Sequence, residues 1–545
     1  MSATQTSRGK AAYAAPISDE EWLLSVQKKL YTRSWQNPDY VFRKLWGYIT
    51  DLRNLRWSLD RVSRSKGSRS AGVDGVTVRM ILAKGSEVYV EELRRALRSG
   101  EFRPSPAKRK LIPKAGKPGK FRPLGIPTLT DKVVQTAMKH IMEPIFEADF
   151  YPYSYGFRPG KSVHGALEQL RLLMSTSELK RSPEDTPRLP YQWAIEGDIK
   201  GCFDNISHHG LMNRVRRRIG EGRLNRLIVA FLKAGVMSEE RFLRTPAGTP
   251  QGGILSPLLA NIALSVIEER YERHVWPRFR PTRRDDVEGI RRRAKAYRRC
   301  DKERGRPVLV PVRYADDFII LIGAPKGENC EEQARELAEE EKAELARLLK
   351  DELNLELSET KTLVTPMTEP IRFLGFHFRA QWDPVYGWTA KVTIPKAKSQ
   401  ALREQIKVVF RRPTINQTLE KRLKELNPVI RGWVYFYRHA MGAKRVFSSL
   451  DHYIWHAIYR WLKKKHPRTG FKKLAKRYAH TSIGGTRYYW HEGKTLPFQL
   501  ASIRVGRYRL GWQPELNFVA TPMESPVHNE RCTPGLGKGS PETAG

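Results

Sequence analysis

The sequence predicts an α+β fold in which an antiparallel sheet of apolar strands is accompanied by helices. The strand signal is clearest in residues 309–322, LVPVRYADDFIILI, where apolar and β-branched residues run up to Tyr314 and resume at Phe318. This is the pattern of two buried strands joined by a tight turn. The helix signal is clearest in residues 331–354 and 20–64, where apolar residues alternate with charged residues at helical spacing.

Two adjacent carboxylates, Asp316 and Asp317, occupy the tip of this hairpin. Asp is common in turns because it forms local hydrogen bonds, so a solvated turn is one interpretation. However, two anions at the tip of an apolar hairpin repel each other and are costly to desolvate, unless a cation lies between them and a further carboxylate. This second interpretation requires a partner from elsewhere in the chain.

Asp198 is the predicted partner. The run Trp193-Ala194-Ile195 indicates a strand that ends at Asp198 and is followed by a small-residue turn and Phe203. Three carboxylates at strand ends suit hard divalent ions such as Mg²⁺, which prefer oxygen ligands and keep positions open for phosphate oxygens.

The composition points to a polyanionic partner. The chain has 545 residues, enough for two to four domains, and a formal charge of +40 with a pI of about 10.1. The cations are spread along the chain, so they predict a basic surface and nucleic acid as the first candidate. No run approaches the 18 or so apolar residues of a membrane span, so we expect no membrane partner. The four cysteines form no Cys-x-x-Cys pair, which predicts neither disulfides nor a zinc site and suits a reducing cytoplasm.

Several motifs resemble those of one protein family. Asp198 and the box Tyr314-Ala315-Asp316-Asp317 resemble motifs A and C of reverse transcriptases. Further segments resemble the group II intron reverse transcriptase/maturases: SAGVDGVT (70–77), KRKLIPKAGKPGKFRPLGIP (108–127), PYSYGFRPGKSVHGAL (152–167), TPAGTPQGGILSPLL (245–259, motif B), LSETKT (357–362, motif D) and LNPVIRGWVYFY (426–437, domain X). The resemblance implies a right-hand polymerase with fingers, a palm containing the antiparallel sheet, and an α-helical thumb or maturase domain X.

The resemblance also implies roles for individual residues. Asp198, Asp316 and Asp317 would be catalytic and would bind two Mg²⁺ ions together with Ile199, and Lys361 would act near the leaving pyrophosphate. Lys114 and Arg122 would contact the triphosphate, Phe203 the ribose, and Gln251 the nucleotide and template. Arg158 and Lys161 are expected to contact the template backbone. For the basic residues, the alternative is a solvated loop; for Phe203, it is core packing.

The expected domains are a flexible N-terminus (1–19), an N-terminal extension (20–77), fingers and palm (78–392), a thumb or domain X (393–490) and a basic C-terminal segment with a disordered tail (491–545). Within the thumb, helices are expected at 402–410, 419–439 and 446–465. Arg460, Lys463 and Lys464 are the expected intron RNA contacts; a solvated face is the alternative.

The basic insertion at 268–306 is either an exposed helical hairpin or an RNA-binding elaboration. The tail has His528, Asn529 and Cys532 but no cysteine pairs, so no HNH endonuclease is expected.

The expected function is to copy group II intron RNA into cDNA for intron mobility and to bind that RNA as a maturase that promotes its splicing. The expected partners are the intron RNA, a DNA target with its primer, and dNTPs. A purely structural splicing factor, an RNA-dependent RNA polymerase and a host repair or phage defence polymerase are the alternatives. Phe203 argues against the second, because a ring beneath the ribose leaves no room for a 2′ hydroxyl.

Overall fold

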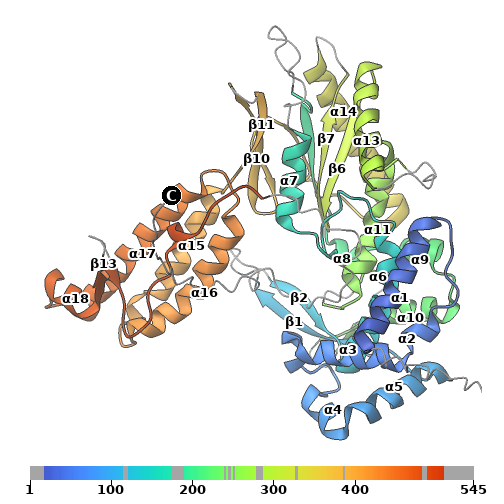
Figure 1. Cartoon of the computed structure of the whole chain (residues 1–545), viewed down its shortest axis with the longest axis horizontal. Coiled ribbons are helices and arrows are strands. Elements are labelled where there is room, and N and C mark those ends of the chain that lie inside the picture. Colours follow the sequence, from blue (N-terminus) through green and yellow to red (C-terminus); the bar gives the residue numbers. More distant parts are fainter. Residues whose placement is uncertain are drawn as a thin grey trace, which may run out of the picture. The chain divides into compact units, whose positions relative to one another are not determined.

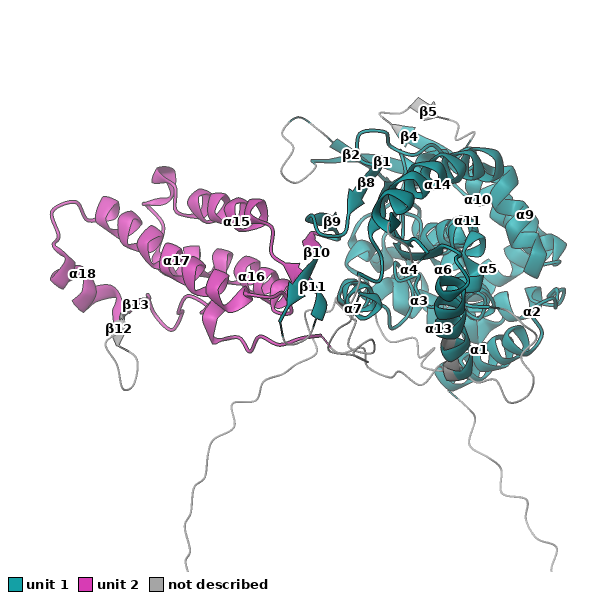
Figure 2. Ribbon diagram, turned by 90° about the horizontal axis from the view of Figure 1, so that it is seen from above, with its two compact units in different colours: residues 1–374, 379–390, 510–520 teal, residues 375–378, 391–509, 521–545 magenta. Residues whose placement is uncertain are grey.

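The computed structural model of the chain describes residues 18–113, 119, 121–174, 189–238, 241–243, 247–249, 252–277, 287–325, 329–384, 387–481 and 488–508. These residues divide into two compact units, which Figure 2 draws in different colours. Within the described residues, the first unit comprises 18–374 and 379–390, and the second comprises 375–378 and 391–508.

The first unit begins with helices that surround one long buried helix, α6 (Leu129–Glu147). The first helix starts at a capping box, in which the Ser18 side chain accepts from the Glu21 N–H and the Glu21 carboxylate accepts from the Ser18 N–H. Buried side chains then bind carbonyls of α6, for example Asn54 Nδ2 to Ala137 O at 3.1 Å. The helices predicted in residues 20–64 are thus confirmed. They are α1 (Asp19–Gln36), α2 (Trp46–Ile49) and α3 (Leu52–Arg64), followed by α4 (Val78–Lys84) and α5 (Ser86–Ser99), as Figure 1 shows.

The predicted basic hairpin is present. Strands β1 (Ala107–Pro113) and β2 (Phe121–Ile126) pair in antiparallel fashion, and β1 also runs parallel to β4 (Val236–Ser238), which pairs with β5 (Arg241–Leu243). Every residue of β1 after Ala107 is exposed, so the hairpin extends away from the core.

The central sheet carries the candidate site. It consists of β6 (Val308–Tyr314), β7 (Asp317–Gly323), β3 (Trp193–Asp198) and β8 (Leu363–Pro366), in the order β6-β7-β3-β8, and neighbouring strands are antiparallel. Residues 318–323 of β7 are all buried, as the apolar run predicts for a central strand. Helix α14 (Cys330–Leu353) packs on β3 and β7, and α7 (Val163–Leu173) packs on β6.

The basic insertion contains a helix, α13 (Val287–Glu303), whose C-terminal end is anchored by one buried carboxylate. Asp301 accepts from Arg273 Nε at 2.7 Å and lies 2.9 Å from His274 Nε2, and it also pairs with Arg306. The hydrogen bond from Arg273 holds the pKa of Asp301 well below its usual range. The remaining helices of the first unit are α8 (Cys202–Asn205), α9 (His208–Arg218), α10 (Gly222–Lys233), α11 (Ser256–Arg270) and α12 (Glu272–Val275).

The second unit is mainly helical, as predicted. Its helices are α15 (Lys396–Val409), α16 (Leu419–Tyr437), α17 (Ala443–Lys465) and α18 (Phe471–Tyr478), with the short pair β12 (Ala479–Thr481) and β13 (Tyr488–Trp490). Strands β9 (Ile371–Phe373), β10 (Phe376–Asp383) and β11 (Gly387–Thr393) precede them, in the order β11-β10-β9.

The expected end of the thumb at residue 490 is too early. Leu500 is completely buried, and its N–H donates to Asp451 Oδ1 on α17 at 2.8 Å, so the chain continues to pack on this unit beyond β13. A sequence pattern could not show this, because the anchoring carboxylate lies 49 residues earlier. Helices with the length and apolar surface of a membrane span are absent from the described parts of the chain.

Candidate active site at the tip of the central hairpin

The three predicted carboxylates come together at one edge of the central sheet. Strand β6 ends at Tyr314, residues 315 and 316 form the turn, and β7 begins at Asp317. Asp198, the last residue of β3, is the register partner of Asp317 on the neighbouring strand. Cross-strand partners have Cβ atoms roughly 5 Å apart, so these two carboxylates are close neighbours. The hairpin and the partner strand predicted from the sequence are both confirmed.

The electrostatics of this edge are those of crowded anions. Loss of hydration, together with the charges of Asp316 and Asp198, raises the pKa of Asp317 to about 6. Burial also raises the pKa of Asp316, and the charge of Asp198 adds to this effect, while Arg122 and Lys361 oppose it. Lys361 Nζ lies 2.6 Å from Asp198 Oδ2. Lys361 and the β2 residue Arg122 therefore lie within electrostatic range of the carboxylates.

The donor chemistry suits a divalent cation. Carboxylate oxygens are the ligands that Mg²⁺ prefers, and a cation between these three groups would relieve the repulsion that raises two of their pKa values. In the described ranges, a group of three or more His, Cys, Asp or Glu side chains already arranged to hold a metal ion is not found. Ile199 has a buried side chain and an antiparallel bridge to Leu357, so only its backbone carbonyl is a possible ligand.

The loop of motif B packs directly on the turn that carries Phe203. Thr249 N donates to Phe203 O at 2.6 Å, and Gly248 N donates to Ile206 O at 2.8 Å. A Cβ on Gly248, whose φ is +87°, would lie only 2.4 Å from Asp204 O, so glycine permits this approach. The half-buried Phe203 is thereby held at the edge of the site.

Phe157 is a site residue that sequence reasoning did not single out. Its ring meets the Phe203 ring edge-on, with centroids 6.2 Å apart and an interplanar angle of 83°. Phe157 has φ of +58°, which is uncommon for a bulky residue, and it is 44% exposed. The place of Phe157 in the SYGFRPG box is the one sequence feature that could have indicated it. Residue preferences could not, because phenylalanine rarely adopts left-handed backbone.

Two predicted nucleotide contacts, Lys114 and Gln251, lie outside the described residues. Their neighbours nevertheless connect the hairpin to motif B. A Cβ on Gly252, whose φ is +109°, would lie 2.2 Å from Gly125 O on β2. The backbone after Gln251 therefore approaches the strand that carries Arg122.

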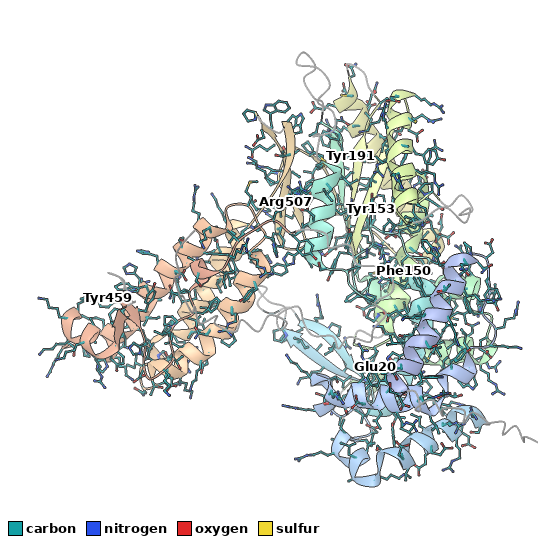
Figure 3. The ribbon with its side chains drawn as sticks, in the orientation of Figure 1. Glu20, Phe150, Tyr153, Tyr191, Tyr459 and Arg507 are labelled. Carbon is teal, nitrogen blue, oxygen red and sulfur yellow. The ribbon has the colours of Figure 1, made fainter. Side chains whose placement is uncertain are left out.

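The expected role of Arg158 as a template contact requires correction. Arg158 is buried, with 9% of its surface exposed, and its guanidinium binds the Glu147 carboxylate at 2.9 Å and the carbonyls of Tyr151 and Ser154. It also lies 5.2 Å from the ring centre of Phe150, which Figure 3 labels. Its donors are occupied inside the fold, so it supports the loop structurally. Lys161 lies nearer the surface, with Nζ 5.3 Å from the Tyr155 ring centre.

The second unit presents a basic surface over an aromatic core. Tyr459, labelled in Figure 3, stacks on the fully buried Trp490 with centroids 5.7 Å apart, and Trp455 and Phe471 join them. Trp490 is therefore a packing residue with Trp455 and Tyr459 partly buried against it, whereas Phe471 is 40% exposed. The predicted contacts Arg460, Lys463 and Lys464 are exposed on α17. Sequence reasoning did not name four further exposed cations on α18, although the amphipathic string FKKLAKRY could have indicated them: Lys472, Lys473, Lys476 and Arg477.

Comparisons with known proteins agree with this arrangement. Residues 112–378 match the family "Reverse transcriptase (RNA-dependent DNA polymerase)", and residues 399–479 match "Group II intron, maturase-specific domain". The chain is 35% identical to protein YkfC of Escherichia coli K12 over 378 residues, covering 69% of this chain and 93% of YkfC. It is 33% identical to the group II intron-encoded protein LtrA of Lactococcus lactis over 389 residues, covering 66% of this chain and 60% of LtrA. The chain thus spans less than two thirds of LtrA. On these matches, this chain is a member of the group II intron reverse transcriptase/maturase family.

Proposed function

We propose that this protein copies group II intron RNA into cDNA and that it also binds the intron RNA as a maturase to promote splicing. The observation that carries the polymerase proposal is the cross-strand register of Asp198 and Asp317, with Asp316 in the adjoining turn. The maturase proposal is supported by the matched maturase-specific domain and by the exposed cations of α17 and α18.

In the proposed reaction, the 3′ oxygen of a primer attacks the α-phosphate of a dNTP, a new phosphodiester bond forms, and pyrophosphate leaves. Two Mg²⁺ ions bound by Asp198, Asp316 and Asp317, with the carbonyl of Ile199, would lower the pKa of the primer hydroxyl and offset the phosphate charge. The protein's own cations assist the departure of pyrophosphate. Lys361 is 57% exposed beside Asp198, so its ammonium is available to a phosphate oxygen and can donate a proton to the leaving group.

The two units take the roles of a polymerase hand in this proposal. Helices α1 to α3 form the N-terminal extension, the β1–β2 hairpin belongs to the fingers, the central sheet is the palm, and the helices of the second unit are the thumb or domain X. Arg122 on β2 acts electrostatically on Asp316 and would contact the triphosphate. The aromatic core of the second unit holds α17 and α18 together, so that their cations form one surface for the phosphates of a structured RNA.

Sequencing the RNA that co-purifies with the protein tests the intron assignment. The expected result is a lariat or linear intron that contains this reading frame. A broad sample of the host transcriptome would instead favour a repair or defence polymerase. Primer extension on an RNA template by the same preparation, with Asp316→Asn as the inactive variant and Asp351→Asn on the surface of α14 as the control, tests the polymerase assignment separately.

A further inference from the structure

A fully buried arginine lies at the end of β6, immediately before the Tyr314 to Asp317 box. The side chains of Arg313 and its partner Glu268 on α11 are both 0% exposed, and Arg313 Nε donates to Glu268 Oε1 at 2.7 Å. The other Glu268 oxygen, Oε2, has no hydrogen-bond partner among the described residues. Arg313 is therefore the group that compensates the buried Glu268 charge.

The remaining guanidinium donors form a second bond to α11 and tie two other segments to this pair. Arg313 Nη1 donates to Ala315 O at 3.0 Å and to Asn261 Oδ1 at 3.1 Å, and Nη2 donates to Ser154 Oγ at 2.9 Å. The guanidinium thus connects helix α11, the 153–156 segment and the turn before Asp316. An apolar side chain at this position would pack the buried strand without forming these four hydrogen bonds. The arginine therefore serves to link the segments that it binds.

The turn that Arg313 contacts needs support. Ala315 has φ of +58°, in the left-handed region that residues with a Cβ rarely adopt. Backbone contacts surround it: Arg313 N donates to Tyr153 O at 3.0 Å and Tyr155 N donates to Arg313 O at 2.8 Å, and Figure 3 shows Tyr153 beside this sheet. A Cβ on Gly156 would lie 2.3 Å from Ala315 N. Asn261 Nδ2 also donates to Gly156 O at 2.8 Å, so Asn261 joins both sides of the network.

We infer that Arg313 is a positioning residue, which holds the Ala315 carbonyl and thereby sets where the carboxylates of Asp316 and Asp317 stand. This inference rests on the proposed function, because it assumes that those carboxylates bind the catalytic cations. Arg313 touches no substrate atom in this proposal. Arg313 would affect the reaction by holding the turn that orients the metal ligands, as residues that hydrogen-bond to metal ligands do.

The fold supplies a matched control. Arg214 on α9 is also buried, with 5% of its surface exposed. It pairs with Glu269, the residue after Glu268 on α11. Its guanidinium also donates to Ile262 O at 2.9 Å and to Ser265 Oγ at 2.8 Å, both on α11. Arg214→Lys therefore disturbs another buried arginine that pairs with α11, although Glu269 is 34% exposed, and it does so through bonds that do not involve residues 314–317.

The test compares Arg313→Lys with Arg214→Lys by thermal unfolding, by primer extension at varied Mg²⁺, and by Mn²⁺ binding without substrates, measured from the electron paramagnetic resonance signal of the free ion. We expect both variants to unfold at lower temperature. Only Arg313→Lys should lower kcat and weaken Mn²⁺ binding, each by about tenfold, and raise the half-saturating Mg²⁺ concentration. A merely structural role would lower both variants' unfolding temperatures and leave the ion dependence unchanged, which would overturn the inference.

Two further variants keep the test decisive. If Arg313→Lys does not fold, Ser154→Ala removes a single guanidinium bond, and a rise of about twofold in half-saturating Mg²⁺ is expected; an unchanged value overturns the inference. Ala315→Gly should partly restore kcat in the Arg313→Lys background, because glycine adopts positive φ without support. The proposed function is judged separately by Asp316→Asn: if that variant extends primers normally, the polymerase assignment fails, whatever Arg313→Lys does.

Discussion

Asp198 and Asp317 are register partners on antiparallel strands β3 and β7, so two carboxylates from distant parts of the sequence stand side by side at the edge of the sheet. The adjoining Asp316 completes the group, and Lys361 Nζ lies 2.6 Å from Asp198 Oδ2. Anions brought this close are unfavourable unless cations compensate them, and substrate phosphates and their metal ions are such compensation. This relationship is the physical basis of the polymerase assignment.

Asp316→Asn should abolish cDNA synthesis and leave intron RNA binding and splicing nearly unchanged. The substitution removes one negative charge from the cation site, whereas the proposed RNA surface lies on the helices of the second unit. Primer extension and splicing are measured on one preparation, with Asp351→Asn as the control. Full primer extension by the Asn variant would contradict the metal-site assignment.

Acid should destabilise the first unit through His140. Burial, together with the charges of Arg61 and Lys139, lowers the pKa of His140 to about 3. In the unfolded chain the imidazole titrates near pH 6.5, so as pH falls below that value the unfolded state takes up a proton that the folded state refuses. The stabilisation present above pH 6.5 is therefore lost at roughly 1.4 kcal/mol per pH unit, or about 2 kcal/mol at pH 5.

His140→Gln, which can still donate to Asn54 Oδ1, checks this prediction. The difference in unfolding free energy between wild type and variant, measured by urea denaturation from pH 5 to pH 7.5, should shrink as pH falls. Other groups, such as Asp131 with its raised pKa, titrate in both proteins and cancel in the difference. A difference that stays constant with pH would mean that His140 becomes protonated within the fold.

Replacing Arg460, Lys463 and Lys464 by Ala should weaken intron RNA binding and splicing more than primer extension on a short generic template. Each lost phosphate contact should reduce the slope of log K against log salt by about one unit. The control replaces three cations of α14, which lie among glutamates with which they pair: Lys342, Arg347 and Lys350. Equal slopes for the two triple variants would mean that the cations of α17 form an ordinary solvated face.

Local patterns predicted the hairpin and the three carboxylates because apolar runs and turn residues act over a few positions. The register that pairs Asp198 with Asp317 is tertiary, and no local pattern gives it. Arg158 was expected at the template backbone from its place in the SYGFRPG box, and its partner Glu147 comes from α6, which no local pattern indicates. Arg313 did carry a signal, because a charge inside a buried apolar strand must be paired, although the sequence does not say with what.

The sugar preference of the polymerase is expected to depend on Phe203, five positions after Asp198. A ring beneath the incoming ribose fills the space of a 2′ hydroxyl and offers it no hydrogen-bond partner. Ribonucleotides are therefore excluded because their 2′ hydroxyl would clash with the ring and would lose its hydrogen bonds to water. In the structure this ring is half-buried, the backbone carbonyl of Phe203 accepts from Thr249 N, and the ring is nearly perpendicular to that of Phe157. These contacts hold the ring in place, as a discriminating side chain requires.

Phe203→Val should therefore raise rNTP incorporation relative to dNTP by about tenfold or more, equivalent to roughly 1.4 kcal/mol per tenfold step, while dNTP incorporation continues. Single-nucleotide primer extension with dNTP and rNTP in parallel measures the ratio. Phe157→Leu should shift the ratio in the same direction but less, because it removes the ring that packs against Phe203 and leaves Phe203 itself in place. If Phe203→Val lowers both incorporations equally, the ring serves only packing; if the wild type already uses rNTPs as well as dNTPs, the site does not select the sugar.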